Sequence, residues 1–353
     1  MTVYLHGLST ALPPYCLNQD EVQRRASIIF GETYPQFDRL SKTFSSAGIN
    51  QRYSVVPIEW FSDPHGWTDR NAAFIAGAKL LFIDAATRAL DDAGWAASNV
   101  DCVVSVCSTG IATPSLEAQA FGEMGFRDDI MRVPLFGLGC AGGVSGLSVA
   151  QSIAAGRKGA KILLVVVETC TLSFRSDRLQ KADIIATVLF GDGAAAACIS
   201  STPQAGEQAI TLSDGFQKIW PDTLDIMGWD VDETGLGVVF DRSIPSFVTQ
   251  EFAGATAAAL DAANLNHKQI DRYVCHPGGA KVVTAIEGAL HLQQGSLDAE
   301  RRVLHEAGNM SAPTVMFVMK SVIEGGGHGQ MMACALGPGF TAAFLPFYVS
   351  EAA

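Results

Sequence analysis

Hydrophobic and polar positions along this chain follow two alternating patterns. Short apolar runs typical of buried strands alternate with segments in which apolar residues recur every three or four positions, as in amphipathic helices. We expect strands at 100–107, 133–136, 161–167, within 190–200, 209–213, 272–275 and 331–336, and helices at 72–93, 116–124, 144–155, 246–264, 280–290 and 312–324. This alternation predicts a layered α/β fold.

The pattern of strands and helices begins again after a polar connector at 201–207. A chain of 353 residues is long enough for about two domains of roughly 150 residues each. We therefore predict two similar halves, residues 1–205 and residues 206–353.

Composition narrows the class of protein. The chain is 48% hydrophobic and 17% charged and holds 35 glycines, which is typical of a compact α/β enzyme. Its 24 basic and 36 acidic residues give a net charge of −12. This charge argues against nucleic-acid and anionic-membrane partners, because it repels phosphate groups.

Eight cysteines are scattered without the paired spacing of a metal site, so we expect reduced thiols and no metal. The first residues lack the features of a signal peptide. The apolar run at 162–167 is far shorter than the ~20 residues that a membrane helix needs. The sequence thus predicts a soluble, cytoplasmic protein with no membrane span.

The strongest candidate for chemistry is Cys140, which lies in a glycine-rich turn between a predicted strand and a helix of small residues. At a helix N-terminus the dipole and the free N–H groups favour a thiolate, and the same groups can hold an oxyanion. Cys140 is therefore a candidate nucleophile. The alternative is a buried core cysteine beside glycines that serve only helix packing.

Two residues of the second half are candidate partners. His276 ends a short predicted strand, and strand ends are where ligands bind in layered α/β sheets. Asn309 lies just before a predicted helix. Each also has a simpler interpretation, His276 as a strand-end histidine with its hydrogen bonds satisfied and Asn309 as a helix N-cap. Together with Cys140 they form a coherent set for acyl chemistry.

Five motifs in order along the chain resemble those of type III polyketide synthases, the chalcone-synthase-like branch of the thiolase superfamily. They are GCAGG at 139–143, LFGDGA at 189–194, HPGG at 276–279, GNMS at 308–311 and LGPG at 336–339. The resemblance covers nearly the whole length. It implies a duplicated thiolase fold with αβαβα layers and a homodimer.

The resemblance also implies a reaction. Cys140 would carry the acyl chain of a starter thioester, and His276 would lower the pKa of Cys140 as an imidazolium partner. His276 and Asn309 would hydrogen-bond the malonyl-CoA carbonyl during decarboxylation, where charge develops on oxygen. Acyl-CoA and malonyl-CoA are the implied partners, and no cofactor is required.

Further positions match the cavity of the family. Phe190 matches an aromatic gatekeeper between the coenzyme A tunnel and the catalytic space, although a core phenylalanine is the simpler interpretation. Val238 stands where plant members carry a second gatekeeper phenylalanine, which argues against the plant chalcone reaction. The remaining matched cavity positions are small and weakly polar, namely Ser108, Thr109, Cys170, Ser173 and Ser311.

Trp229 stands where plant members carry glycine, and the MGWD stretch at 227–230 is similar to bacterial alkylresorcinol and alkylpyrone synthases. We therefore expect a fatty acyl-CoA starter, with Trp229 redirecting the cavity; plain core filling is its alternative role. Starter length, number of extensions, cyclisation mode and delivery by a carrier protein stay open.

For coenzyme A, Arg39 and Lys42 match the basic entrance helix of the family, with Arg52 nearby as a weaker candidate. A solvated helix face is their simpler interpretation. The backbone of Gly278 and Gly279 would lie close to the pantetheine arm. Two other functions are kept open, a ketoacyl-carrier-protein synthase that performs one condensation and a non-catalytic homologue of the condensing enzymes.

Overall fold

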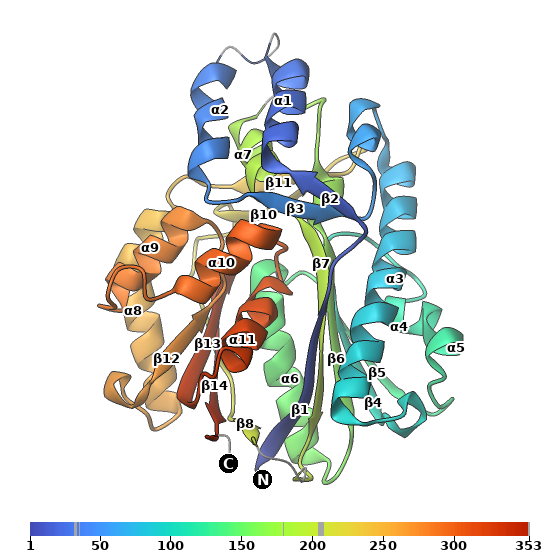
Figure 1. Ribbon diagram of the computed structural model, residues 1–353, viewed down its shortest axis with the longest axis vertical. Helices are drawn as coiled ribbons and strands as arrows, with labels where there is room; N and C mark the ends of the chain where they lie inside the picture. The colour runs from blue at the N-terminus through green and yellow to red at the C-terminus, as the bar shows by residue number, and fades with distance from the viewer. Residues whose placement is uncertain (32–33, 35, 179, 204–207, 352–353) are drawn as a thin grey trace.

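A mixed sheet of ten strands forms the centre of the molecule (Figure 1). The computed structural model describes residues 1–31, 34, 36–178, 180–203 and 208–351. β4 pairs in parallel with β5 and β6, β12 pairs in parallel with β13, and the other neighbours in the sheet are antiparallel. In sheet order the strands are β12 (Arg272–Cys275), β13 (Gly329–Gly337), β14 (Thr341–Val349), β8 (Ile210–Leu212), β1 (Val3–Ala11), β7 (Asp192–Ser200), β6 (Ile162–Thr169), β4 (Cys102–Val106) and β5 (Met131–Leu135), and β9 (Phe216–Ile219) also pairs with β14.

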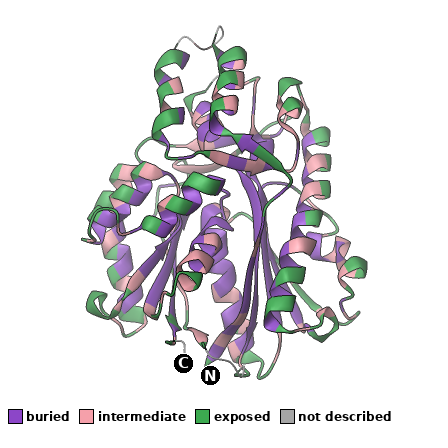
Figure 2. Ribbon diagram, in the orientation of Figure 1, coloured by how far each residue is buried: buried purple, intermediate pink, exposed green. Residues whose placement is uncertain are grey.

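Helices cover the sheet in three layers. α6 (Gly142–Gly156) and α11 (Thr314–Glu324) pack in the middle, between the strands of the two halves. α3 (Trp67–Ala93) covers the outer face of the first half, while α8 (Ile244–Ala262) and α9 (Ala280–Ala289) cover that of the second. The strands are buried and the outer helices present an exposed face (Figure 2). These are the αβαβα layers expected from the sequence.

Strand alternation explains why the layers form. In β6, Leu164 faces the middle helices and its neighbour Leu163 faces α3, and both are fully buried. In β13, Ala333 faces the middle layer and Cys334 faces α8 and α9. Because successive side chains of a strand point to opposite faces, strands apolar on both faces need a helix layer on each side.

Most predicted elements are confirmed within a few residues. The helix predicted at 72–93 is α3, which begins at Trp67 and ends as expected before Gly94, where a left-handed backbone forms the C-cap. The segment 116–124 is not one helix but two short ones, α4 (Leu116–Gln119) and α5 (Phe121–Met124).

Several elements were not predicted. α1 (Gln19–Phe30) and α7 (Lys181–Leu189) pack with α2 (Phe37–Ser46) at one end of the molecule (Figure 1). Below this group lie two hairpins, β2 (Tyr15–Asn18) with β3 (Gln51–Ser54) and β10 (Met227–Val231) with β11 (Leu236–Phe240). α10 (Asp298–Ala307) packs against α11.

The two halves share one continuous sheet, since β8 pairs with β1 on one side and with β14 on the other. The boundary predicted at 205/206 lies outside the described residues. Among the helices of the described residues, none is both long and apolar enough to cross a membrane.

Candidate active site

Cys140 lies in a short 3-10 turn, Gly139–Ala141, directly before α6. Gly139 adopts φ of +47°, a left-handed conformation that favours glycine. A side chain at Gly143 would come within 2.3 Å of the Ala312 carbonyl oxygen, so glycine lets α6 pack tightly against the segment before α11. These glycines therefore bring the thiol next to residues 309–312.

The backbone of Asn309 is fixed on both sides. It forms an isolated β-bridge with Phe190, at the end of α7. The Asn309 N–H donates to the Leu189 carbonyl at 2.9 Å, and the Gly191 N–H donates to the Asn309 carbonyl at 3.0 Å. Asn309 lies five residues before the start of α11, so its interpretation as a helix N-cap is wrong.

The Asn309 side chain is oriented by its neighbours. Its Oδ1 accepts a hydrogen bond from the Ser311 N–H at 2.8 Å, which identifies the other end of the amide as the donor. One hydrogen of Nδ2 is donated to the Gly278 carbonyl at 3.2 Å. The Asn309 side chain also acts as a hydrogen-bond partner of the Cys140 thiol, which lowers the pKa of that thiol.

His276 directly follows β12, and its N–H donates to the Cys334 carbonyl at 2.8 Å. The side chain is only 5% exposed. Within the described part of the chain neither ring nitrogen has a hydrogen-bond partner, so the satisfied strand-end interpretation is wrong. An unpaired buried polar group costs about 1–3 kcal/mol, and a bound substrate is a natural source of the missing partner.

Cys140, His276 and Asn309 line one cavity, although they are far apart in the sequence. Gly278 joins them, and apolar side chains from several elements complete the wall, among them Met227 of β10, Phe240 of β11 and Phe252 of α8. The arrangement places a thiol, an imidazole and an amide N–H around a single space from which most water is excluded.

Burial decides the protonation of this site. It raises the pKa of the Cys140 thiol to about 11, although the Ser311 and Asn309 side chains act to lower it. Burial also lowers the pKa of His276 to about 3. Both shifts act against the expected thiolate–imidazolium pair, because desolvation disfavours the charged form of each group.

Glu168, the next-to-last residue of β6, is a buried acid that the sequence analysis missed. Its Oε2 accepts hydrogen bonds from the Ser108 N–H at 2.9 Å and the Thr109 hydroxyl at 2.7 Å, while Oε1 has no partner in the described residues. Burial raises its pKa to about 7, and its charge helps to raise the pKa of Cys140. The signal available in the sequence for this residue was an acidic side chain at the end of an otherwise apolar strand.

Trp229 and Val238 lie directly opposite each other on the hairpin β10–β11. The Trp229 indole N–H donates to the Ser108 carbonyl at 2.8 Å, and the Ser108 hydroxyl accepts from the Gly139 N–H at 3.2 Å. The hairpin is therefore linked to the turn that carries the nucleophile.

A second, apolar cavity contains three of the predicted cavity residues, Cys170, Ser173 and Phe190. Residues of α1, α7 and the 3-10 turn Ile58–Ser62 form the rest of its wall. Burial is the main cause that raises the pKa of Cys170, and the charges of Glu168, Asp192 and Cys140 add to it. Ser311 lies next to Cys140 instead, within hydrogen-bond reach of the thiol. The Thr109 hydroxyl donates a hydrogen bond to Glu168.

Of the predicted coenzyme A contacts, only Gly278 lines the catalytic cavity, while Gly279 lies against Leu189. Arg39 and Lys42 are exposed on α2 and have no ion-pair partner among the described residues. Arg52 is not a surface residue. It is 2% exposed, donates to the carbonyls of Thr187 and Phe190 and lines the apolar cavity, so its weaker assignment to coenzyme A stays a prediction.

Comparison with known proteins matches both halves to one family. Residues 3–203 match the N-terminal domain of chalcone and stilbene synthases, and residues 211–346 match the C-terminal domain. The 1,3,6,8-tetrahydroxynaphthalene synthase of Streptomyces peucetius subsp. caesius is 35% identical over 96% of this chain and 91% of its own. The structure of the synthase of the same name from Streptomyces coelicolor A3(2), a bacterial type III polyketide synthase, superposes with a TM-score of 0.93 at 26% identity, over 99% of this chain and all of the other. Type III polyketide synthase C of Arabidopsis thaliana is 29% identical over 95% of this chain and 92% of its own.

Proposed function

The chain belongs to the chalcone and stilbene synthase family, and from that premise we propose that Cys140, His276 and Asn309 are its catalytic residues. The protein is a type III polyketide synthase with the thiolase fold, an acyltransferase that performs decarboxylative condensation of coenzyme A thioesters. The observation that supports the residue roles is the meeting of the three side chains in one buried cavity.

Loading begins with a neutral thiol and a neutral imidazole. His276 takes the proton of Cys140 as the sulfur attacks the carbonyl carbon of the starter thioester. The carbon–sulfur bond to coenzyme A breaks, and His276 returns the proton to the departing thiolate. Because burial disfavours both charged forms at rest, proton transfer is coupled to attack, and the idle thiol is protected from other electrophiles.

Extension uses the donors around the same space. When malonyl-CoA loses carbon dioxide, the electron pair of the broken carbon–carbon bond forms an enolate, whose oxygen accepts from Nδ2 of Asn309 and from His276. The enolate carbon attacks the Cys140 thioester and releases the sulfur. Because the Asn309 amide is already oriented by Ser311 and Gly278, its alignment costs little during the reaction.

We propose a fatty acyl-CoA starter and an alkylpyrone or alkylresorcinol product. The support is the apolar cavity that contains Cys170 and Phe190, since its wall consists mostly of apolar side chains, as an alkyl chain requires. Trp229 supports the same proposal, because a hydrogen bond to the Ser108 carbonyl holds its large ring beside the Ser108 segment.

Purified protein incubated with malonyl-CoA and hexanoyl-, lauroyl- or palmitoyl-CoA, without a carrier protein, tests the starter. We expect alkylated pyrones or resorcinols by mass spectrometry, with the long starters preferred. The relatives named tetrahydroxynaphthalene synthase indicate another possible product, and a product without an alkyl chain would contradict the fatty starter. A product formed only with a carrier protein would favour a ketoacyl-carrier-protein synthase.

Two buried alanines allow the acyl cavity to be tested. Ala26 of α1 and Ala186 of α7 line it, and Ala26→Leu or Ala186→Leu places a larger side chain inside. We expect the preferred starter to become shorter in both variants. Ser27→Leu adds the same side chain on an exposed position of α1 and serves as the control. Unchanged starter preference in correctly folded variants would place the alkyl chain elsewhere.

Trp229→Gly is expected to change product length or ring type, because it removes the hydrogen bond that links the hairpin to the Ser108 segment. Val231→Ala, at the exposed end of the same strand, is the matched control. An unchanged product profile for Trp229→Gly would assign the side chain to core filling.

We further propose a homodimer in a reducing cytoplasm. The side chains of Ile111, Phe136 and Val231 are more than half exposed, and they line a common groove that reaches Gly139. Exposed apolar groups that gather in this way are typical of protein interfaces. All eight cysteines are free thiols, which favours a reducing compartment such as the cytoplasm. Light scattering is expected to give a dimer that Phe136→Asp weakens, and a monomeric wild type would exclude this interface.

A further inference from the structure

The hairpin β10–β11 forms one wall of the catalytic space. Met227 and Phe240, paired across the hairpin, line the cavity of Cys140. Trp229 and Val238 are the next cross-strand pair on the same face. A small movement of this hairpin therefore changes the shape of the space in which the polyketide grows.

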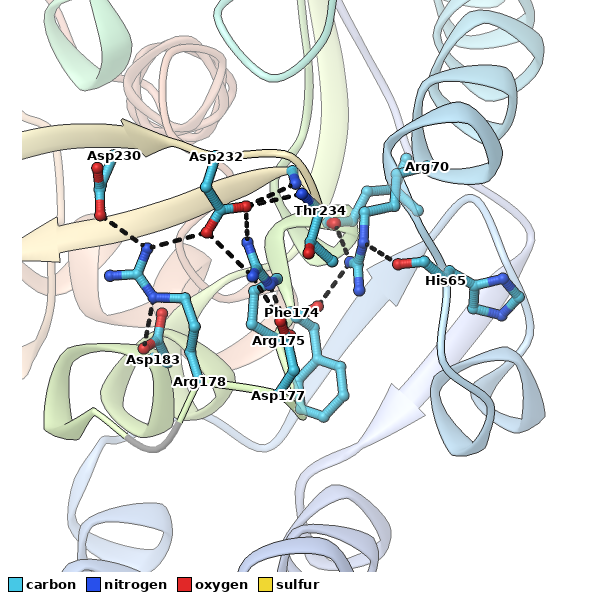
Figure 3. A network of polar contacts seen from close by, with 12 residues as sticks. His65, Arg70, Phe174, Arg175, Asp177, Arg178, Asp183, Asp230, Asp232 and Thr234 are labelled. Atoms are coloured by element: carbon cyan, nitrogen blue, oxygen red, sulfur yellow. Dashed lines mark hydrogen bonds and ion pairs between the residues drawn. The ribbon is translucent and has the colours of Figure 1, made fainter.

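The second, apolar cavity has a wall of its own, part of which is the 3-10 turn Cys170–Ser173 that follows β6. Arg70 of α3 holds this turn from behind. Its guanidinium donates to the carbonyls of Leu172 at 2.7 Å and Phe174 at 2.6 Å, and to the His65 carbonyl at 2.9 Å (Figure 3). Main-chain carbonyls thus fix Arg70 and the turn relative to each other.

Arg175, two residues after this turn, links the two walls. Its side chain is 2% exposed and lies between two carboxylates (Figure 3). It donates to both oxygens of Asp177, at 2.7 and 2.6 Å, and to both oxygens of Asp232, at 2.9 and 3.1 Å. Paired two-point contacts of this kind fix orientation as well as distance. Asp177 lies on the segment of Arg175 itself, whereas Asp232 lies at the end of the hairpin.

Asp232 also shapes the turn of the hairpin. Its Oδ1 accepts hydrogen bonds from the Thr234 N–H at 2.8 Å and the Gly235 N–H at 3.1 Å. The turn is therefore ordered by the same carboxylate that Arg175 binds. Arg178 adds a contact further along the hairpin, where its guanidinium packs over Gly237 and reaches Asp230 at 3.0 Å.

We propose that Arg175 and Asp232 are positioning residues that set the distance between the hairpin wall and the Cys170–Ser173 wall, and thereby select starter length and the number of extensions. Neither residue lines the cavity of Cys140, so they act through the wall residues. The inference rests on the polyketide synthase activity of this family and not on a fatty acyl-CoA starter.

Asp232→Asn is the sharpest test. The amide oxygen of asparagine can keep both hydrogen bonds of the turn. The substitution therefore removes only the negative charge and one of the two hydrogen bonds to Arg175. We expect the ratio of products that differ by one extension to change by about tenfold, the scale at which a pocket distinguishes one methylene group. Malonyl-CoA decarboxylation without starter is expected to stay within about twofold, because Asn309 and His276 are held separately.

Asp177→Asn is the matched control, because it breaks the other two-point contact of Arg175 without touching the hairpin. It is expected to leave the product ratio unchanged. Arg175→Lys keeps the positive charge but loses the planar guanidinium that makes the two-point contacts, so its product ratio is expected to shift as in Asp232→Asn. Asp232→Glu restores the charge and is expected to return part of the wild-type ratio.

Two results would overturn the proposal. One is an unchanged product ratio in Asp232→Asn and Arg175→Lys with every starter of the hexanoyl-, lauroyl- and palmitoyl-CoA panel. The other is an equal shift in Asp177→Asn, which would mean that general loosening is responsible. Circular dichroism melts of all variants identify any that do not fold, and Arg175→Lys keeps the test decisive if Asp232→Asn is one of them.

Discussion

The proposed catalytic centre and the hairpin β10–β11 border the same cavity, but they are held in different ways. Asn309 and His276 are fixed mainly by main-chain hydrogen bonds to Leu189, Gly191 and Cys334. The hairpin is attached through side chains, by the ion pairs of Arg175 and Arg178 and the indole N–H of Trp229.

This difference separates reactivity from selectivity. Main-chain hydrogen bonds depend little on the identity of neighbouring residues, so the centre keeps its geometry when nearby side chains change. Ion pairs depend on particular side chains and weaken when one partner is altered. Substitutions in the hairpin are therefore expected to change which product forms, and substitutions in the centre to change whether one forms.

The largest effect is expected from Cys140→Ala, which removes the only atom that the acyl chain is proposed to bond. Condensation with any starter is expected to fall by on the order of 10⁴-fold or more. Product formation and uptake of radiolabelled acyl groups measure it. Cys16→Ala, at an exposed cysteine, is the control. Residual acylation of the Cys140→Ala protein would move the nucleophile to another thiol.

Asn309→Asp comes next, because the side chain keeps its size and its contact with the Ser311 N–H but loses the donor aimed at the enolate. Malonyl-CoA decarboxylation is expected to fall about a hundredfold, as in oxyanion holes that lose one donor. His276→Ala is expected to impair the same step. The control is Asn266→Asp, at a helix start remote in sequence. Normal decarboxylation in both site variants would refute the two roles.

The protonation of the centre predicts how stability varies with pH. With the pKa of His276 at about 3 in the native protein and 6.5 in the unfolded chain, the unfolded chain binds the proton first as pH falls. His276 therefore contributes stability above pH 6.5 that is lost progressively toward pH 3. Between pH 7 and pH 4 this loss is about 3 kcal/mol in the wild type and absent in His276→Gln.

Urea unfolding at several pH values measures this difference. An imidazolium held by a Cys140 thiolate would have a raised pKa and would give the opposite sign. The rate of Cys140 alkylation by iodoacetamide is a second measurement, since a neutral thiol reacts faster as pH rises toward about 11. A rate that is constant from pH 7 upward would show an ion pair at rest.

The smallest effect is expected from Asp230→Asn in the hairpin. Asp230 is 62% exposed and bonds Arg178 at 3.0 Å, and exposed pairs contribute about 0–1 kcal/mol. We expect a change in the free energy of unfolding below about 1 kcal/mol and a product ratio close to that of the wild type. A shift of the product ratio as large as that of Asp232→Asn would mean that the ion pairs of both Arg175 and Arg178, and not the Arg175–Asp232 pair alone, position the hairpin.

The hairpin was absent from the predicted elements for a physical reason. Its strands contain Gly228 and Gly237 and are followed by the charged residues Asp232 and Asp241, so the alternation of apolar and polar positions is weak. The pairing of Trp229 with Val238 also depends on a turn held by Asp232 and Arg175, a contact between residues 57 positions apart.

The sequence by itself determined the alternation of strands and helices, the nucleophile turn and the order of the family motifs, because these depend on residues close together in the chain. Tertiary structure alone decided three things. It brought Cys140, His276 and Asn309 to one cavity, it buried Glu168 where its charge acts on Cys140, and it shifted the pKa values of the thiol and the imidazole away from their charged forms. Desolvation depends on everything packed around a group, and that surrounding exists only when distant segments have come together.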